Sequence, residues 1–390
     1  MKTTRLIGVI TGLSIAAFAL PLRAQISIPS DGSDGALVIS NNTVIDLSQA
    51  VTGVWSNNNS GNAGKGIYDP AKWAVVFKYS SVTISNGATL TFKNHPAHAP
   101  VVWLVAGDVT VNGNISVDGQ NGGASDSSAP DGGPGGFRGG VASLPTLNLL
   151  AGPGFGPGGS NGINGTYVYG NSGNVPLIGG SGAGGGGLAG SAGGGAILIA
   201  CAGSINLAGT VHANSGSVPS GYFGGSGGSI RLIADQLQGS GSLSAVSSPS
   251  GGGDNGRIRI EANNISRNIG SFPNAVASVP VINTPAIWPA TNAPTVHLVS
   301  VAGQSAPTDP HASLSSDVDL VVTTNVATLT FQTANFPITG TLSVFVKPRN
   351  GNQATYQATY ITGDSNLATW QLTTNLPLNS FIVQERAVSP

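Results

Sequence analysis

The sequence predicts an all-β chain: a right-handed parallel β-solenoid with a glycine-rich insert, followed by a β-sandwich. Three observations indicate this fold class. Glycine is abundant, at 59 of 390 residues, whereas only 8% of the residues are charged. Four segments with period-two alternation align with one another. A proline-rich stretch then separates them from a series of short alternating segments, which is the pattern of a sandwich.

Residues 1–24 have the pattern of a secretory signal peptide. Lys2 and Arg5 precede the apolar run LIGVITGLSIAAFAL, and Ala24 offers a small residue at the expected cleavage point. That run is shorter than the roughly 20 residues a membrane span requires, and no other apolar run approaches this length. We therefore expect export, a secreted or outer-surface location, and no membrane span after signal cleavage.

The solenoid is predicted over residues 25–270 because four segments, starting at Val101, Ala196, Ser229 and Arg257, repeat one pattern. The alignment predicts three inward columns: Val102, Ile197, Ile230 and Ile258; Leu104, Ile199, Leu232 and Ile260; and Ala106, Cys201, Ala234 and Ala262. Between them, the outward positions are Trp103, Leu198, Arg231 and Arg259, and the two arginines with Glu261 predict a solvated ladder with a weak ion pair. Short strands of this kind bury a core only when successive coils stack, so like residues should form ladders.

Three further segments complete the chain. The insert, about 119–195, is very rich in glycine, and its spaced apolar residues predict compact loops on one flank of the solenoid. Residues 271–294 are rich in proline and predict an extended linker. Residues 295–390 contain about seven short candidate strands, DVDLVVT among them, and predict an immunoglobulin-like or fibronectin-like sandwich without the cysteine pair of antibody domains.

The segments SVTISNGATLTF, VVWLVAGDVTVNGNISVDGQNGG and GGSGGSIRLIADQLQGSGSLSA resemble those of bacterial secreted glycine-rich parallel β-helix proteins. These proteins are regarded as exoprotein-like or adhesin-like. The resemblance covers roughly residues 31–269 and its motifs specify architecture. It implies export and a structural or adhesive role at the cell surface.

Several sequence features argue against a cofactor, a metal or nucleic acid. The net charge of −1 gives no basic footprint for a phosphate backbone. Gly182, Gly184 and Gly187 match a G-x-G-x-x-G pattern, but an alternating strand follows them where a dinucleotide site needs a helix. His95 and His98 lack the further ligands that zinc requires. We predict no cofactor site and no metal site.

Carbohydrate is the partner class that we expect, as extracellular polysaccharide or cell-surface components. Aromatic rings pack on the C–H faces of sugars, and five aromatic residues lie at predicted outward or loop positions: Trp103, Tyr167, Tyr169, Tyr222 and Phe223. An alternative interpretation is that these rings attach the loops to the solenoid.

The function predicted is non-enzymatic and structural or adhesive, with a glycan as the expected ligand. The alternative is a carbohydrate-active enzyme, a polysaccharide lyase or glycoside hydrolase, on the same scaffold. Such enzymes need clustered carboxylates, and no two acids share a column of the alignment. We therefore assign no catalytic residue. Asp118 aligns with Asn214 just before the insert, whereas Asp126 and Asp131 lie in the insert, where the alignment does not apply.

Overall fold

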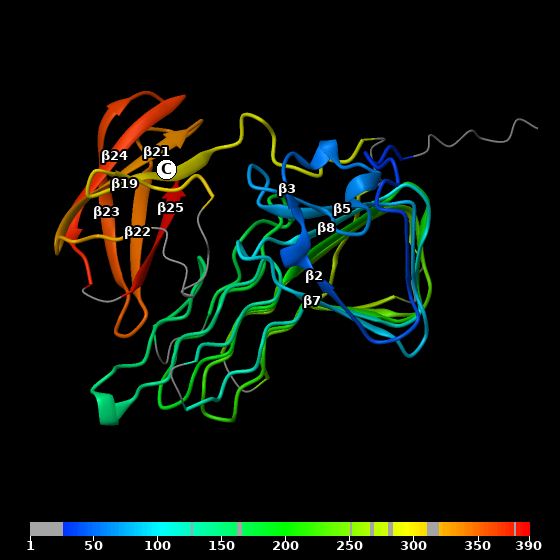
Figure 1. Ribbon diagram of the computed structural model, residues 1–390, viewed down its shortest axis with the longest axis horizontal. Helices are drawn as coiled ribbons and strands as arrows, with labels where there is room; N and C mark the ends of the chain where they lie inside the picture. Colours follow the sequence, from blue (N-terminus) through cyan, green and yellow to red (C-terminus); the bar gives the residue numbers. More distant parts are fainter. Residues whose placement is uncertain are drawn as a thin grey trace, which may run out of the picture.

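The computed structural model describes residues 26–390 apart from 126–127, 162–165, 250–251, 266–268, 280–283, 310–319 and 378–379. The predicted signal peptide lies outside the described residues. The chain is all-β, with parallel sheets followed by an antiparallel curled sheet (Figure 1). The only helical elements in the described ranges are four short 3-10 turns: η1 (Leu47–Gln49), η2 (Trp55–Asn57), η3 (Ser60–Asn62) and η4 (Pro145–Leu147). None of them has the length and apolar character needed to cross a bilayer.

The parallel part consists of three columns of strands, each strand paired with those of neighbouring turns of the chain. The first column holds β5 (Ala74–Tyr79), β8 (Val101–Val105), β11 (Ala196–Cys201), β14 (Ser229–Gln238), β16 (Arg257–Ile265) and β18 (Val276–Val279). The second holds β1 (Ala36–Ile39), β6 (Ser81–Ile84), β9 (Val109–Val111), β12 (Ser204–Leu207) and the later halves of β14 and β16.

The third column holds β2 (Thr43–Asp46), β7 (Thr89–Lys93), β10 (Asn114–Ser116), β13 (Thr210–His212), β15 (Ser242–Ser244) and β17 (Gly270–Phe272). At the start of the first column, β4 (Ile67–Asp69) pairs antiparallel with β5, and β3 (Val51–Thr52) pairs parallel with β4. One continuous hydrophobic core runs through the turns. Because β17 and β18 continue the columns, part of the predicted 271–294 linker belongs to the parallel sheets.

The predicted register is correct for the later turns and wrong by one residue for the strand Val101–Val105. Ile230 pairs with Ile258 and Arg231 with Arg259, as expected. Ile197, however, pairs with Val101, and Ile199 pairs with Trp103. A one-residue shift reverses the two faces of a strand. Trp103 is therefore fully buried in the core, with 0% exposure, and does not project outward.

The error arises because β8 is apolar at all five positions. Its sequence therefore has no apolar–polar alternation to show which residues face the core. Both faces are apolar because the outer face of the first column is also covered. Ile26, Ile28 and Ile287 pack there in a second hydrophobic cluster, together with Leu177 of the insert.

The one-residue shift also changes the third predicted column. Cys201 lies opposite Val105, and Ala106 is exposed and outside the inward column that was predicted for it. Cys201 itself is buried, as predicted.

The segments that cover the outer face of the first column also make the prediction of a solvated arginine ladder wrong. Arg231 lies beside Arg259 in register, but it is buried. Its Nη2 atom donates to Glu261 Oε1 at 2.8 Å, and Nε of Arg259 donates to the same oxygen at 2.8 Å. The carboxylate thus lies between two guanidinium groups, which is an arrangement that offsets part of the cost of burying charge.

The glycine-rich insert folds as extended segments that hydrogen-bond to one another through their backbones. Gly180 N donates to Gly194 O, Gly193 N to Phe137 O, and Gly182 N to Phe155 O, all at 2.7–2.9 Å. A Cβ atom on Gly182 would lie 1.9 Å from the carbonyl oxygen of Arg138. Glycine is required at such positions because a neighbouring backbone segment occupies the space that a side chain would need.

The antiparallel sheet has the order β20-β19-β21-β24-β23-β22-β25. Its strands are β19 (Thr295–Val301), β20 (Gln304–Ser305), β21 (Val326–Ala334), β22 (Thr341–Pro348), β23 (Ala354–Gly363), β24 (Leu367–Asn375) and β25 (Phe381–Val388). It has its own hydrophobic core, which includes Phe331, Val344 and Trp370. The segment DVDLVVT was expected to be a strand, but its described residues 320–323 are not one, and residues 317–319 lie outside the described ranges.

Lys347 of β22 connects this sheet to the glycine-rich insert. Its Nζ atom donates to Gly154 O at 3.0 Å and to Gly156 O at 2.9 Å, and the residue is only 2% exposed. Burial lowers the pKa of Lys347 to about 7. Beside it, Asn350 Nδ2 donates to Leu150 O and Gly351 N to Ala151 O.

Replacing Gly182 with alanine should reduce the free energy of unfolding by about 1–3 kcal/mol, because the new methyl group must displace the Arg138 backbone. Gly186→Ala is the matched control, since a Cβ atom there meets nothing within 4 Å. Thermal unfolding of both variants measures the effect. Equal melting temperatures for the two variants would show that the insert is not packed at backbone contact.

The stability of the chain should rise with pH through the titration of Lys347. The native pKa of about 7 lies below the unfolded value of about 10.5, so between these values the unfolded state binds the extra proton. Unfolding free energy should therefore increase from pH 7 to 10, and Lys347→Met should lose this contribution. Unfolding curves across this range test the slope, with the exposed Lys65→Met as control. An unchanged slope in Lys347→Met would contradict the prediction.

Candidate functional site

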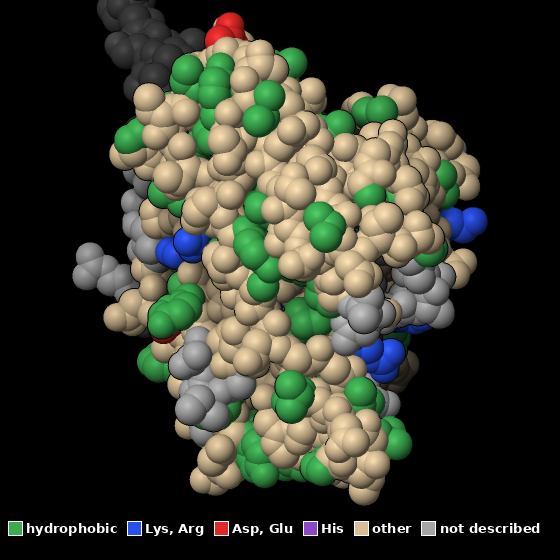
Figure 2. All heavy atoms as spheres, turned by 90° about the vertical axis from the view of Figure 1, so that its left-hand side faces the viewer, with side chains coloured by type: hydrophobic (Ala, Val, Ile, Leu, Met, Phe, Trp, Pro, Cys, Tyr) green, Lys and Arg blue, Asp and Glu red, His purple; other side chains and the backbone are tan. Residues whose placement is uncertain are grey.

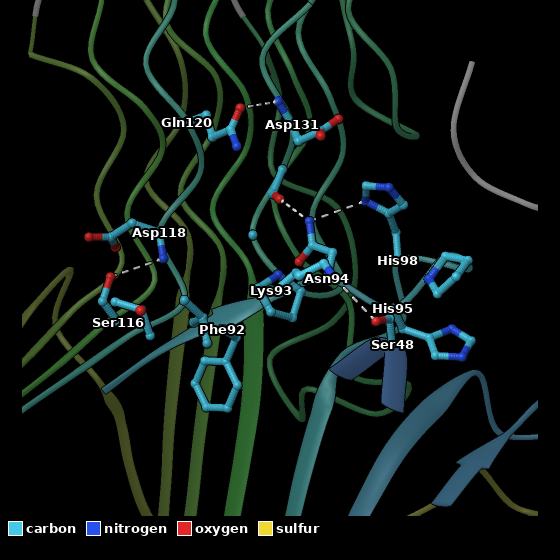
Figure 3. A pocket seen from close by; sticks show the side chains of 16 residues that line it. Ser48, Phe92, Lys93, Asn94, His95, His98, Ser116, Asp118, Gln120 and Asp131 are labelled. Atoms are coloured by element: carbon cyan, nitrogen blue, oxygen red, sulfur yellow. Dashed lines mark hydrogen bonds between the residues drawn. The ribbon is translucent and has the colours of Figure 1, made fainter. Parts of the chain in front are cut away.

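The candidate site is a pocket of about 650 Å³ where the third column meets the glycine-rich insert. Its walls come from segments far apart in the sequence: residues 91–98 at the end of β7, residues 116–120 after β10, and residues 131–134 of the insert, with Ser48 at one side (Figure 3). Stacking of successive turns brings these segments together.

The two histidines of the 94–98 turn shape its wall. His98 N donates to His95 O at 2.8 Å, and Ala97 N donates to His95 Nδ1 at 3.1 Å. The His95 ring stacks on Tyr68 with 4.0 Å between ring centroids. Burial lowers the pKa of His98, although Asp131 acts in the opposite direction. Within the described ranges, no group of three or more His, Cys, Asp or Glu residues could hold a metal ion.

Asn94 supplies a buried hydrogen-bond acceptor to this site. Its Nδ2 atom donates to Gly132 O at 2.7 Å and lies 3.5 Å from His98 Nδ1. Its Oδ1 atom is buried and has no hydrogen-bond partner among the described residues. A buried carbonyl oxygen without a partner is costly, so a ligand hydroxyl or a water would stabilise it.

Two carboxylates line the same pocket but point in opposite directions (Figure 3). Asp118 Oδ1 accepts from Asn214 N at 2.5 Å, and its Oδ2 lies 4.0 Å from His212 Nδ1. Asp118 is thus held toward the next turn of the chain. Asp131 is fixed through its backbone, because Asp131 N donates to Gln120 Oε1 at 3.1 Å and Gln120 N donates to Asp131 O at 2.9 Å.

The pKa of Asp118 is raised by burial, which is the largest effect. The Asn214 N–H and the nearby His212 act in the opposite direction. Burial disfavours the ionised form of a carboxyl group, whereas a hydrogen bond donated to its charged oxygen favours that form. The carboxyl group therefore keeps its proton to a higher pH than an exposed aspartate does.

The structure does not bring the five predicted sugar-contact residues into the pocket. Trp103 has no exposed surface and is no longer a candidate. Tyr167 is 67% exposed, and Tyr169, Tyr222 and Phe223 are at least partly exposed, in the glycine-rich segments. Asp126 lies outside the described residues. Asn94 and Gln120 were not predicted, because only the stacking of turns places these ordinary polar residues in one pocket.

No match was found in comparisons with models of protein families, with curated proteins and with solved structures.

The stability of Asp118→Asn relative to wild type should increase as pH rises. A carboxyl whose native pKa is raised stabilises the fold at pH values below its unfolded pKa, and this contribution is lost as pH rises through the native pKa. The difference in unfolding free energy between Asp118→Asn and wild type should therefore increase from pH 3.5 to pH 7. Denaturant titrations at several pH values measure it, and a constant difference would contradict the assigned burial effect.

Proposed function

We propose that this chain is a non-enzymatic secreted or cell-surface protein with a structural or adhesive role, which binds neutral polysaccharide. We propose for its fold a right-handed parallel β-solenoid followed by an immunoglobulin-like or fibronectin-like sandwich. The three columns of parallel strands and the single core through successive turns support the first part. The separate core of the antiparallel curled sheet supports the second.

The pocket is the observation that carries the binding proposal. Its lining includes the carboxylates of Asp118 and Asp131, and hydrogen bonds to Gln120 hold the backbone of Asp131 in place. Sugars are rich in hydroxyl donors, and carboxylate and amide oxygens accept from them. A volume of about 650 Å³ is in the range of small-ligand sites and suits a short stretch of glycan.

The low charge of the chain favours a neutral glycan over an anionic one. Only 8% of the residues are charged, and few charged side chains lie on the face shown in Figure 2. Lys93, the cationic side chain at the pocket, is already paired with Asp46 at 2.9 Å. An anionic polymer would meet the acidic groups of Asp118 and Asp131.

The second candidate is a carbohydrate-active enzyme, and one observation favours it: Asp118 and Asp131 line one pocket, and the pKa of Asp118 is raised. A proton donor of a glycosidase needs such a raised pKa, but it acts across the scissile bond from a second carboxylate. Here the two carboxylates point apart and Asp118 accepts from Asn214 N. We therefore favour binding without cleavage.

The test is to incubate the purified chain lacking residues 1–24 with a panel of neutral and acidic polysaccharides. Both retention of the protein and release of reducing or unsaturated ends are measured. We expect retention on neutral polymers without release. Asp131→Asn should weaken retention about tenfold or more, because it alters an acceptor in the pocket. Asp235→Asn is the matched control, since Asp235 lies outside the pocket and accepts from Asn263 Nδ2.

The outcomes separate the alternatives. Release of ends that disappears in Asp118→Asn or Asp131→Asn would establish the enzyme instead. Retention that survives Asp131→Asn but is lost in Tyr167→Ala or Tyr169→Ala would place binding on the exposed tyrosines. The absence of retention on every polymer would contradict glycan binding altogether.

A further inference from the structure

The third column of the parallel stack ends in strands that are paired on one side only within the described residues. In the third column, β2 is the first strand and pairs only with β7, and β17 is the last and pairs only with β15, within the described part of the chain. A terminal strand of a parallel sheet presents backbone donors and acceptors to whatever lies beyond it. Each end therefore offers a template for a further parallel strand.

The hydrophobic core is also less well covered at the two ends than in the middle. The inward residues of the interior turns, such as Leu90, Ile115 and Val211, are almost completely buried. The apolar residues only partly buried against this core include Leu37 and Ile45 in the first turn. They also include Ile265, Ile269 and Ala275 in the last turn. A further turn at either end would bury them.

One column of outward side chains is polar in the interior turns and apolar at both ends. Following the register of the third column, the outward position is occupied by Val44, Thr91, Ser116, His212, Ser244 and Phe272. The four interior members are polar, whereas both end members are large and apolar. Val44 is 62% exposed and Phe272 is 61% exposed. Val44 and Phe272 thus place exposed apolar side chains at the two ends of one polar ladder, where a partner strand would cover them.

We propose that copies of this chain stack head to tail, with β17 of one copy pairing with β2 of the next. The ends fit because both are strands of the same column with the same chain direction, so a parallel pair continues the existing ladder. In this register Phe272 lies beside Val44, and the partly buried core residues of the two ends face one another. The antiparallel sheet lies to the side of the stacked turns in Figure 1.

Head-to-tail contact between different surfaces gives an open filament when each copy advances along the stacking axis, as continuation of the third column requires. The assembly proposed here does not depend on the proposed glycan pocket. The third column continues through the interface, so the pocket beside it would recur along the filament. Multivalent display of this kind increases avidity for a polymer.

Sedimentation velocity of the chain lacking residues 1–24 tests the assembly, over about 1 to 100 μM protein. We expect a mass that keeps rising with concentration beyond a dimer, and linear particles by electron microscopy. Val44→Glu and Phe272→Glu should each weaken association at least about tenfold, because a charge would be buried at the new interface. Both side chains are exposed in the single chain, so circular dichroism and melting temperature should be unchanged.

Mixing the two variants distinguishes head-to-tail contact from other geometries. Val44→Glu keeps an intact β17 end and Phe272→Glu an intact β2 end, so the equimolar mixture should form a dimer although each variant alone does not. Leu367→Glu, at a residue 54% exposed on β24, is the control for loss of a surface apolar group and should assemble as wild type does. Dimers of Phe272→Glu alone would indicate contact between like ends. That result, a monomeric mixture or a monomeric wild type would each overturn the proposal.

Discussion

Each turn of this chain exchanges backbone hydrogen bonds with the turns before and after it, in parallel and in register. Through this contact Ile230 meets Ile258, Leu232 meets Ile260, and one core extends through every turn. No single strand of three to six residues could bury its inward residues alone. The glycine-rich insert extends the same principle to segments without side chains, where backbone packs directly on backbone. Stability and shape both depend on this stacking.

Polar groups of both the parallel stack and the antiparallel sheet are buried where another segment of the chain covers them. Arg231, Glu261 and Lys347 all lie in such covered places, and each finds partners: two arginines share one carboxylate, and the lysine donates to two carbonyl oxygens. Lys347 donates to carbonyl oxygens of the insert, and its pKa falls because burial disfavours the charge. The segments that cover these residues therefore determine how their charged groups are buried and paired in this weakly charged chain.

The candidate pocket is a further product of stacking. Its residues belong to the ends of two strands in neighbouring turns and to an insert that returns to the same corner. Within one turn, Asp118 and Asp131 are simply two acids in a glycine-rich sequence. Stacking places Asp118 against Asn214 and His212 of the next turn, which turns its carboxylate away from Asp131. The same contact that builds the pocket thus disfavours a paired-carboxylate mechanism.

The sequence by itself determined that the chain is all-β, that the segments at Ser229 and Arg257 are in register, and that Cys201 is buried. These conclusions follow from period-two alternation, which reports which residues share a face. Only the tertiary structure decided the register of Val101–Val105, the burial of Trp103 and Arg231, and the meeting of Asn94 with Asp131 in one pocket. The physical reason is that a strand covered on both faces has no polar side to mark its register. Which segment covers it depends on contacts between residues far apart in the chain.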